Sequence, residues 1–190
     1  MKDISLIGFM GCGKSSVGKI LATLLPECRL IDLDTYIEEK QGKNIPEIFN
    51  EYGEAAFRRM EREALEEIFS DKSRPRAILS LGGGTVTSEE CRQLIRQHTD
   101  CFYLRATTDA LLDNLEGHSE GRPMLNSVQP AEASPTETSS ERESLRHRIE
   151  TLMQTRSPQY IATAHHIIDI DGLSFTQIAE AVEDNILNIK

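Results

Sequence analysis

Eight residues near the N-terminus, Gly8–Ser15 (GFMGCGKS), fit the pattern GxxxxGK[ST] of a phosphate-binding loop. Glycines let consecutive backbone N–H groups turn toward one anion without a clash of Cβ atoms. The side chain of Lys14 can reach the β- and γ-phosphates of a nucleotide, and the hydroxyl of Ser15 can ligate Mg²⁺. An apolar run, Ile4–Ile7, precedes the loop and an amphipathic segment follows, so a helix N-terminus would face the anion. This context favours a nucleotide site over the simpler alternative, a glycine-rich turn with a surface lysine.

The phosphate loop predicts a nucleoside triphosphate but not what is done with it, since GTPase switches, ATPases and small-molecule kinases share it. A GTPase would carry an Asn-Lys-x-Asp motif to read guanine, and the sequence holds no Asn-Lys pair. Its one Asp-x-x-Gly string, Asp169–Gly172, follows the last apolar run, where a γ-phosphate switch is not expected. The sequence therefore argues against a GTPase.

Two acids, Asp32 and Asp34, stand where the second apolar run, Leu30–Leu33, ends. Ligands of open parallel sheets collect beyond the carboxyl ends of the strands. The period of two along a strand places both carboxylates on one side of the chain, facing one site. Strand-end acids beside a phosphate loop are expected near Mg²⁺. The alternative is that one of them, more naturally Asp34, only caps a helix that begins near Thr35.

Three consecutive glycines, Gly82, Gly83 and Gly84, follow the third apolar run, Ala77–Leu81. A glycine lets the backbone approach another group closely, so this run favours contact between the backbone and a ligand. A turn in the left-handed conformation is the simpler alternative, but such a turn seldom needs three glycines.

Three arginines stand in segments that could bring them to the same strand ends. Arg58 lies in a charged amphipathic segment, where a solvated helix face fits the periodicity as well as a functional position. Arg122 follows residues 116–121, a polar stretch with two glycines that has the composition of a lid, and an arginine there could meet a transferring phosphate. Arg156 precedes Pro158 in an otherwise helical segment, and a surface arginine at a helix kink fits these residues too.

Short apolar runs alternate with longer segments of helical period. The runs are Ile4–Ile7, Leu30–Leu33, Ala77–Leu81, Cys101–Leu104 and His166–Ile170. The helical stripes are Val17, Ile20, Leu21 and Leu24; Phe57, Met60, Ala64, Leu65 and Ile68; and Phe175, Ile178, Ala179, Val182 and Ile186. This alternation predicts an α/β fold of three layers (α/β/α), with a five-stranded parallel sheet covered by helices on both faces.

Composition narrows the class of protein further. The chain has 21 Lys and Arg against 31 Asp and Glu, a formal charge of -10, which argues against non-specific binding to nucleic acid or to an anionic membrane. No apolar run approaches the roughly 20 residues of a membrane span. Asp3 interrupts any signal-peptide pattern, and four scattered cysteines, Cys12, Cys28, Cys91 and Cys101, form no CxxC pair. We expect a cytoplasmic protein with reduced thiols, and a monomer.

The length of 190 residues predicts a single domain, residues 1–190. Asn126–Ser144 is rich in Pro, Ser, Thr and Glu and has almost nothing to bury, so we interpret it as an excursion within that domain. A lid is expected at about residues 116–125 and a polar insertion at about 126–142. The remaining 46 residues suit a helix, a strand and a closing helix that complete the sheet.

Taken together, these residues resemble the shikimate kinase family, which has the nucleoside-monophosphate-kinase-like phosphate-loop fold. The matching pieces run in family order along nearly the whole chain. They are Gly8–Ser15, Asp32-Leu33-Asp34, residues 42–65 (GKNIPEIFNEYGEAAFRRMEREAL), residues 80–86 (SLGGGTV), Arg122-Pro123-Met124-Leu125, and Arg156-x-Pro-x-Tyr160. Two features depart from the family. Glu116, His118 and Glu120 stand before Arg122, where the family usually carries further basic residues, and the stretch from Asn126 to about Arg142 is longer than usual.

The resemblance implies a role for each matching position. ATP would be held by Gly11, Cys12, Gly13, Lys14, Ser15, Ser16 and Arg122; Mg²⁺ by Ser15 and Asp32; and the substrate by Asp34, Arg58, Gly82, Gly83, Gly84 and Arg156. Lys14, Asp34 and Arg122 would be catalytic. The implied reaction is ATP-dependent phosphorylation of the 3-hydroxyl of shikimate, on the route to chorismate and the aromatic amino acids. The alternatives are a related kinase of gluconate or of a nucleoside monophosphate, and a non-catalytic ATP-binding regulator.

Overall fold

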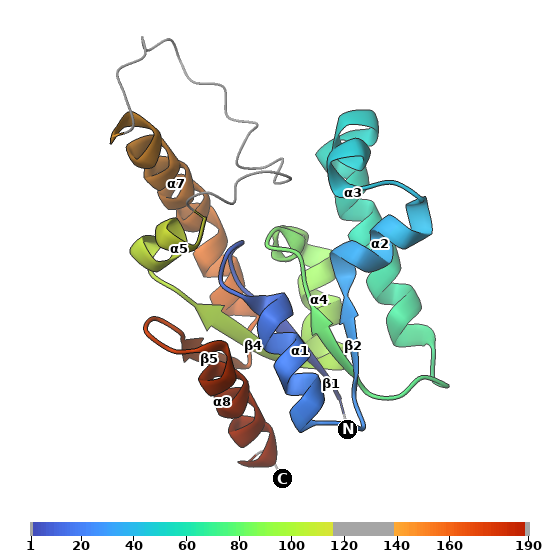
Figure 1. The fold of residues 1–190 in the computed structure, drawn as a ribbon. Coiled ribbons are helices and arrows are strands. Elements are labelled where there is room, and N and C mark those ends of the chain that lie inside the picture. Colours follow the sequence, from blue (N-terminus) through green and yellow to red (C-terminus); the bar gives the residue numbers. More distant parts are fainter. Residues whose placement is uncertain (1, 116–138, 189–190) are drawn as a thin grey trace.

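Five parallel strands form the centre of the fold (Figure 1). A computed structural model describes residues 2–115 and 139–188 of the chain. The strands are β1 (Asp3–Ile7), β2 (Arg29–Asp32), β3 (Ala77–Ser80), β4 (Thr99–Arg105) and β5 (His166–Asp169), in the order β2-β3-β1-β4-β5. The expected lid with Arg122, and residues 126–138 of the expected insertion, lie outside the described residues.

Helices cover both faces of this sheet. They are α1 (Lys14–Leu24), α2 (Leu33–Gln41), α3 (Ile45–Ser70), α4 (Glu89–His98), α5 (Thr108–Leu115), α7 (Ser139–Thr163) and α8 (Phe175–Asn188), with a short 3₁₀ turn η1 (Thr85–Thr87). On one face α1 and α8 pack side by side, and Val17 lies in one buried cluster with Leu6 of β1 (Figure 1). On the other face Leu65 of α3 and Ile95 of α4 share a second cluster with Leu79 of β3. These are the three layers that the sequence predicts.

The segments assigned from apolar periodicity are confirmed as strands and helices, with three differences at their ends. Helix α2 begins at Leu33 rather than near Thr35. Helix α7 begins at Ser139, so the last residues expected in the polar insertion are helical. Phe175, expected in a buried stripe, starts α8 with 46% of its surface exposed.

The register of the parallel strands brings three chain segments together at the carboxyl ends of β1, β2 and β3. Leu6 pairs with Ser80, and Asp32 pairs with the same Ser80 from the other side. The phosphate loop follows Ile7 directly, and the three glycines follow one residue after Ser80. Acids, glycines and phosphate loop therefore meet because their strands end at the same level.

At the other end of the sheet, where the strands begin, one carboxylate joins two neighbouring strands. Asp3, at the start of β1, accepts hydrogen bonds from the backbone N–H of Ala77 at 2.8 Å and from Nη1 of Arg74 at 3.0 Å. Both donors lie around the start of β3, so Asp3 joins two neighbouring strands. In the described parts of the chain, no helix has the length and apolar character needed to cross a membrane.

Replacing Asp3 with Ala should lower the stability of the fold without altering its chemistry. The change leaves the N–H of Ala77 without its side-chain acceptor and the largely buried guanidinium of Arg74 without its carboxylate, although two backbone carbonyls still accept from that guanidinium. We expect a loss of about 2–4 kcal/mol. For a chain of this size that corresponds to a fall in Tm of roughly 5–15 °C, measured by calorimetry. Asp3→Asn keeps one oxygen acceptor and should lose less; an unchanged Tm for Asp3→Ala would contradict this account of the sheet.

Candidate active site

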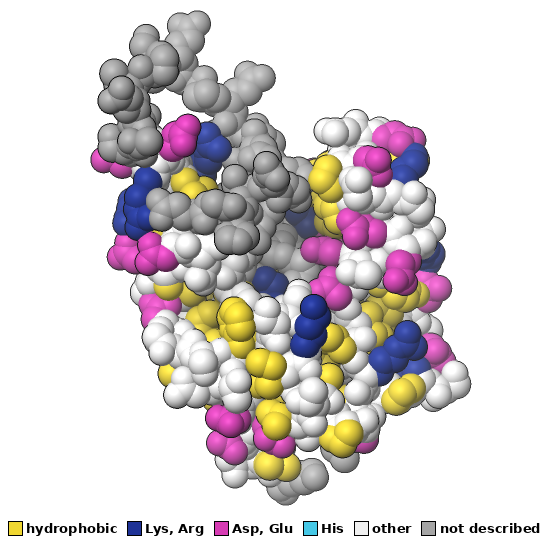
Figure 2. All heavy atoms as spheres, viewed as in Figure 1, with side chains coloured by type: hydrophobic (Ala, Val, Ile, Leu, Met, Phe, Trp, Pro, Cys, Tyr) yellow, Lys and Arg dark blue, Asp and Glu magenta, His cyan; other side chains and the backbone are white. Residues whose placement is uncertain are grey.

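A cavity of about 520 Å³ opens where the acids, the glycines and the phosphate loop meet. The surface is hollowed there, between the side of the molecule that carries α2 and α3 and the rest of the visible face (Figure 2). The lining residues are Met10, Gly11, Gly13, Lys14, Ser15, Ser16, Asp32, Asp34, Ile45, Phe49, Phe57, Arg58, Glu61, Ser80, Leu81, Gly82, Gly83, Gly84, Asn114, Arg156 and Phe175. The cavity is large enough for two small ligands in contact.

The phosphate loop forms one wall of the cavity. Gly11 and Gly13 adopt left-handed backbone conformations, with φ of 84° and 85°, which only glycine adopts without strain. This turn places the first residues of α1, with their unpaired N–H groups, at the cavity. The ammonium of Lys14 donates to the carbonyl oxygens of Gly8 at 2.9 Å and Phe9 at 3.0 Å. The loop can therefore surround an anion with backbone donors and one fixed positive charge.

Cys12 differs from the other loop residues that the resemblance assigns to ATP. Its side chain is 1% exposed and lies in the core behind the loop, with Sγ 3.7 Å from Nζ of Lys14. Cys12 does not line the cavity, whereas Gly11, Gly13, Lys14, Ser15 and Ser16 do. Any contact of Cys12 with a nucleotide would involve its backbone alone.

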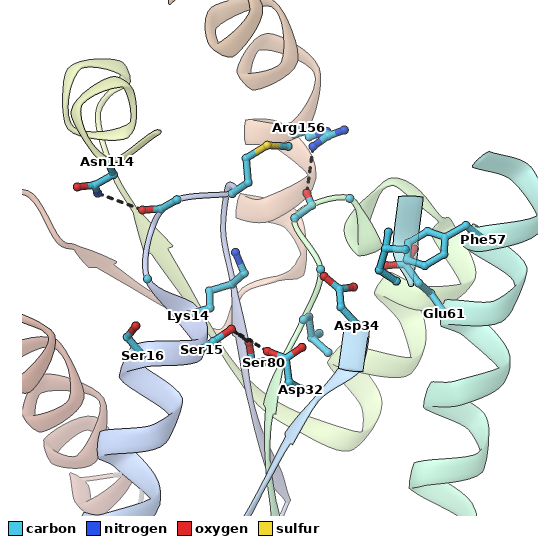
Figure 3. A pocket seen from close by; sticks show the side chains of 18 of the residues that line it. Lys14, Ser15, Ser16, Asp32, Asp34, Phe57, Glu61, Ser80, Asn114 and Arg156 are labelled. Carbon is cyan, nitrogen blue, oxygen red and sulfur yellow. Dashed lines mark hydrogen bonds between the residues drawn. The ribbon is translucent and has the colours of Figure 1, made fainter. Parts of the chain in front are cut away.

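Ser15, Asp32 and Ser80 place oxygen atoms together at the floor of the cavity (Figure 3). The hydroxyl of Ser15 donates to Oδ2 of Asp32 at 2.7 Å and lies 3.1 Å from Oγ of Ser80. Hydroxyl and carboxylate oxygens suit Mg²⁺, which usually binds through one or two protein groups plus waters and phosphates. The described residues contain no cluster of three or more His, Cys, Asp or Glu that would bind a metal without such help. The residues present fit a magnesium ion that arrives with a nucleotide.

The two acids reach the cavity by a route different from the predicted one. Asp32 ends β2 and is the N-cap of α2, since its Oδ1 accepts from the backbone N–H of Thr35 at 3.4 Å. Asp34 already lies in the first turn of that helix. The expectations that Asp34 is the cap and that strand alternation aligns the acids are therefore wrong. A tight change from strand to helix directs both side chains to the cavity instead.

Asp34 stands between the phosphate loop and the glycines (Figure 3). Burial, and then the negative charges of Glu61 and Asp32, raise its pKa from 3.8 to about 7, although Lys14 and Arg58 oppose the shift. A carboxylate that titrates near neutral pH can accept a proton from a hydroxyl group and release it again. The position and the raised pKa of Asp34 would suit either a proton acceptor or a group that orients a substrate hydroxyl.

Arg58 lines the far side of the cavity, next to the glycines. Its Nη1 donates to Oε2 of Glu61 at 2.5 Å and its Nη2 to Oε1 of Glu54 at 3.0 Å. Its side chain is 14% exposed, so the solvated helix face allowed by periodicity is wrong for this residue. A Cβ atom on Gly84 would overlap Nη2 of Arg58, so a larger residue there would displace the guanidinium.

Arg156 approaches the same glycines from α7. It is 3% exposed, and its Nη1 lies 3.4 Å from the carbonyl oxygen of Gly83. Burial lowers its pKa, with a smaller contribution from the charge of Arg58. The alternative of a surface arginine at a kink is therefore wrong. Two guanidinium groups facing one cavity form a site for a carboxylate.

Several lining residues escaped the sequence analysis. Glu61 is fully buried and accepts from Nη1 of Arg58 and from the hydroxyl of Thr85 at 2.5 Å. Its position three residues after Arg58 is the spacing of a helical ion pair and could have revealed it. Asn114 donates from Nδ2 to the carbonyl of Gly11 at 3.0 Å, and no sequence signal marks it. The ring of Phe175 lies against Gly13, where a Cβ atom would be 2.5 Å from it.

We compared the chain with known protein families, with their members and with solved structures. The family model described as "Shikimate kinase" matches residues 10–186. The chain belongs to the shikimate kinase family. Its structure is accordingly that of a phosphate-loop kinase of the nucleoside-monophosphate-kinase type, with a parallel five-stranded sheet.

Curated relatives and solved structures agree with the family model. A shikimate kinase of Thermus thermophilus is 34% identical over 183 residues, which cover 96% of this chain and 89% of the relative. That of Chlorobaculum tepidum is 40% identical over 164 residues, covering 85% and 80%. The solved structure of Acinetobacter baumannii shikimate kinase in complex with shikimate matches with a TM-score of 0.84, at 30% identity, over 100% of this chain and 95% of that one. The shikimate kinase of Bacteroides thetaiotaomicron gives a TM-score of 0.81 at 28% identity, covering 97% and 98%.

The raised pKa of Asp34 predicts a stability that depends on pH. Asp34 binds its proton more tightly in the folded chain, with a pKa of about 7, than in the unfolded chain near 3.8. The contribution of Asp34 to stability therefore falls as pH rises from about 4 to 7, and its loss is complete above 7. Asp34→Asn removes this loss, so at pH 8 its free energy of unfolding should exceed that of the parent by up to about 4 kcal/mol, with a higher Tm. The difference should shrink toward pH 4.5.

Thermal unfolding without nucleotide, at pH 4.5, 6 and 8, measures this effect. Asp184→Asn, at an exposed position of α8, is the matched control and should follow the parent at every pH. A constant difference in Tm between Asp34→Asn and the parent would show that Asp34 is ionised throughout this range.

Proposed function

We propose that this chain transfers the γ-phosphoryl group of ATP to the 3-hydroxyl of shikimate, giving shikimate 3-phosphate and ADP, on the route to chorismate and the aromatic amino acids. The observation that carries the proposal is a single cavity with a phosphate loop on one side, two guanidinium groups on the other, and Asp34 between them. Membership of the shikimate kinase family and the likeness to a shikimate kinase solved with shikimate support it.

ATP would bind at the phosphate-loop side. Backbone N–H groups of Gly11, Gly13 and the first turn of α1 would surround the phosphates, together with the hydroxyls of Ser15 and Ser16. Lys14 would transfer its hydrogen bonds from the loop carbonyls to the β- and γ-phosphates. Arg122, outside the described residues, would contact the phosphates from the lid during transfer. The exposed ring of Phe175 offers the base a surface for stacking at this end.

Mg²⁺ would be held by Ser15 directly and by Asp32 through water. Mg²⁺ exchanges its waters reluctantly and favours one or two protein oxygens with phosphate oxygens completing its shell. The ion would supply charge neutralisation at the β- and γ-phosphates. The hydrogen bond between Ser15 and Asp32 fixes both oxygens before the nucleotide arrives.

Shikimate would occupy the other side of the cavity. Arg58 and Arg156 would bind its carboxylate, since a guanidinium presents a planar fork of donors to two carboxylate oxygens. Gly82, Gly83 and Gly84 would let the ring approach the backbone closely. Asp34 would accept a hydrogen bond from the 3-hydroxyl and hold it toward the phosphate loop.

The reaction then needs little beyond positioning and charge. The 3-hydroxyl oxygen forms a bond to the γ-phosphorus while the bond from that phosphorus to the bridging β–γ oxygen breaks. The hydroxyl proton passes to the carboxylate of Asp34. The transition state is loose, with charge on the peripheral phosphoryl oxygens, and Lys14 and Arg122 neutralise that charge.

Two other functions are kept as alternatives. A kinase of gluconate would also use a carboxylate clamp, whereas a kinase of a nucleoside monophosphate would need a pocket for a second base. A non-catalytic ATP-binding regulator would need neither Asp34 nor paired arginines, so those three residues favour catalysis. The proposal includes a cytoplasmic monomer that binds neither nucleic acid nor membrane, as the net charge of -10 favours.

The function is tested by following ADP release from Mg-ATP with shikimate, gluconate or AMP as acceptor. Shikimate should be the preferred acceptor, with product identified as the 3-phosphate. Lys14→Ala is the matched control and should reduce turnover by at least about a hundredfold, because it removes charge stabilisation from the transition state. Faster ADP release with gluconate or AMP than with shikimate would overturn the proposal.

The two acids should respond differently to Mg²⁺. Asp32→Asn should raise the Mg²⁺ concentration needed for half-maximal turnover, and excess Mg²⁺ should partly restore activity. Asp34→Asn should leave that concentration unchanged while kcat falls at least tenfold, since general-base assistance is typically about 10²–10⁴-fold. Activity measured against Mg²⁺ for both variants gives the answer. Rescue of Asp34→Asn instead of Asp32→Asn would reverse the assignment of the two residues.

A further inference from the structure

Tyr160 is a buried hydroxyl that the proposed mechanism does not use. It lies on α7, one helical turn after Arg156, and is 0% exposed. Its hydroxyl donates to the carbonyl oxygen of Gly83 at 2.5 Å. Its ring stacks on that of Tyr103 from β4, with 4.9 Å between centroids, which fixes its direction. The glycine loop is thereby tied to α7 by a side chain that lies behind the cavity.

The carbonyl of Gly83 faces two donors, and their distances differ. A hydroxyl donor usually lies about 2.5–3.0 Å from its acceptor, and an N–H donor about 2.7–3.2 Å. The hydroxyl of Tyr160 lies at 2.5 Å, the short limit of its range, whereas Nη1 of Arg156 lies beyond its range at 3.4 Å. Tyr160 is therefore the partner that satisfies this carbonyl, and Arg156 is bound to it only weakly.

In the described part of the chain, Arg156 forms no ion pair of its own, although the more distant charge of Glu54 acts on it. Arg58 forms ion pairs with Glu54 and Glu61. Among residues 2–115 and 139–188, no carboxylate lies within ion-pair distance of Arg156. The guanidinium is 3% exposed, so water does little to compensate it. The guanidinium also interacts with the hydroxyl of Tyr160 and lies over the ring of Phe9, 5.8 Å from its centroid. A buried positive charge that faces a cavity and has no ion-pair partner can bind an anion.

We propose that Tyr160 is a positioning residue for the acceptor substrate: by satisfying the carbonyl of Gly83, its hydroxyl keeps Arg156 free to bind the substrate carboxylate. This inference rests on the proposed function, because the carboxylate is that of the phosphoryl acceptor. Burial raises the pKa of Tyr160, so its hydroxyl keeps its proton and remains a donor over the whole working range of pH.

Loss of the hydroxyl would create a competition. Of the donors that the structure describes, the carbonyl of Gly83 would retain Arg156 alone, and a buried carbonyl without a partner is unfavourable. The guanidinium would move the short distance needed for a full hydrogen bond with this carbonyl. Each substrate molecule would then have to displace that bond before its carboxylate could be held. The effect would fall on binding of the acceptor and leave ATP unaffected.

Tyr160→Phe isolates the hydroxyl, since it keeps the ring and its stacking on Tyr103. We expect the KM for shikimate and the Kd from calorimetric titration to rise about tenfold, equal to about 1.4 kcal/mol. The KM for ATP and kcat should stay within twofold of the parent. Tyr103→Phe is the matched control: it removes the hydroxyl of the stacking partner, which interacts with Ser157 rather than with the glycine loop, and should leave both KM values unchanged.

A double-mutant cycle with Arg156→Ala tests the route through the arginine. If Tyr160 acts by keeping Arg156 free, Tyr160→Phe should add nothing to the loss of shikimate affinity that Arg156→Ala causes. Additive losses, an unchanged KM for shikimate in Tyr160→Phe, or an equal rise in the KM for ATP would each overturn the inference. A parent protein that neither binds nor phosphorylates shikimate would instead overturn the proposed function.

Discussion

All five strands run in the same direction, and the cavity depends on that constraint more than on any single contact. In a parallel sheet all the strands have their carboxyl ends on the same side, so the loops that follow the strands lie close together there. The pairing of Asp32 and Leu6 with the same Ser80 sets β1, β2 and β3 to end at one level. The phosphate loop, the capping acid and the glycine run come from positions 8, 32 and 82 of the chain, yet they are neighbours. Contacts at the other end of the strands, such as those of Asp3, serve the site by keeping this register.

Some charged side chains of the cavity have an ion-pair partner and others do not. Glu61 is buried and neutralises Arg58, and Thr85 supplies a further hydrogen bond to it. Burial raises the pKa of Glu61, while Arg58 and Thr85 lower it in opposition. Asp34 has no such partner of its own among the described residues and keeps a pKa near neutrality. The cavity therefore combines one arginine, Arg58, whose guanidinium is held in place by Glu54 and Glu61, with an acid and an arginine, Asp34 and Arg156, that form no ion pair with the described residues.

The sequence predicted what depends on local order and missed what depends on long-range packing. The phosphate loop is contiguous, so its spacing alone specifies its conformation. The central strands β1, β3 and β4 were found because buried parallel strands are rich in apolar residues. The change from β2 to α2 at Leu33 was not predicted, since one residue decides whether Asp34 continues a strand or begins a helix. The sequence left open whether Arg58 and Arg156 lie at the surface or at the site. Helical periodicity shows which residues share a face of a helix, but what that face contacts depends on how α3 and α7 pack around the glycines.

For Cys12 and Phe175 too, the sequence shows the position in the chain but not the surroundings of the side chain. A motif position says that the backbone of Cys12 lies in the loop, but the direction of its side chain depends on the core behind it, where the thiol is buried. Phe175 fits an apolar stripe by spacing, yet it stands at the first residue of α8, where its ring lies beside the phosphate loop and not in the core.

The two carbonyl bonds of Lys14 have a thermodynamic consequence. Because the loop already holds the ammonium at 2.9 and 3.0 Å from its acceptors, this long side chain is ordered before any nucleotide arrives. Immobilising a free lysine would cost up to about 2 kcal/mol of rotamer entropy. That term belongs to the folding of the protein and is absent from binding. When a nucleotide binds, the ammonium of Lys14 exchanges carbonyl acceptors for phosphate acceptors. Its favourable contribution to the free energy of binding comes from the stronger attraction of a cation to phosphate than to carbonyl oxygen.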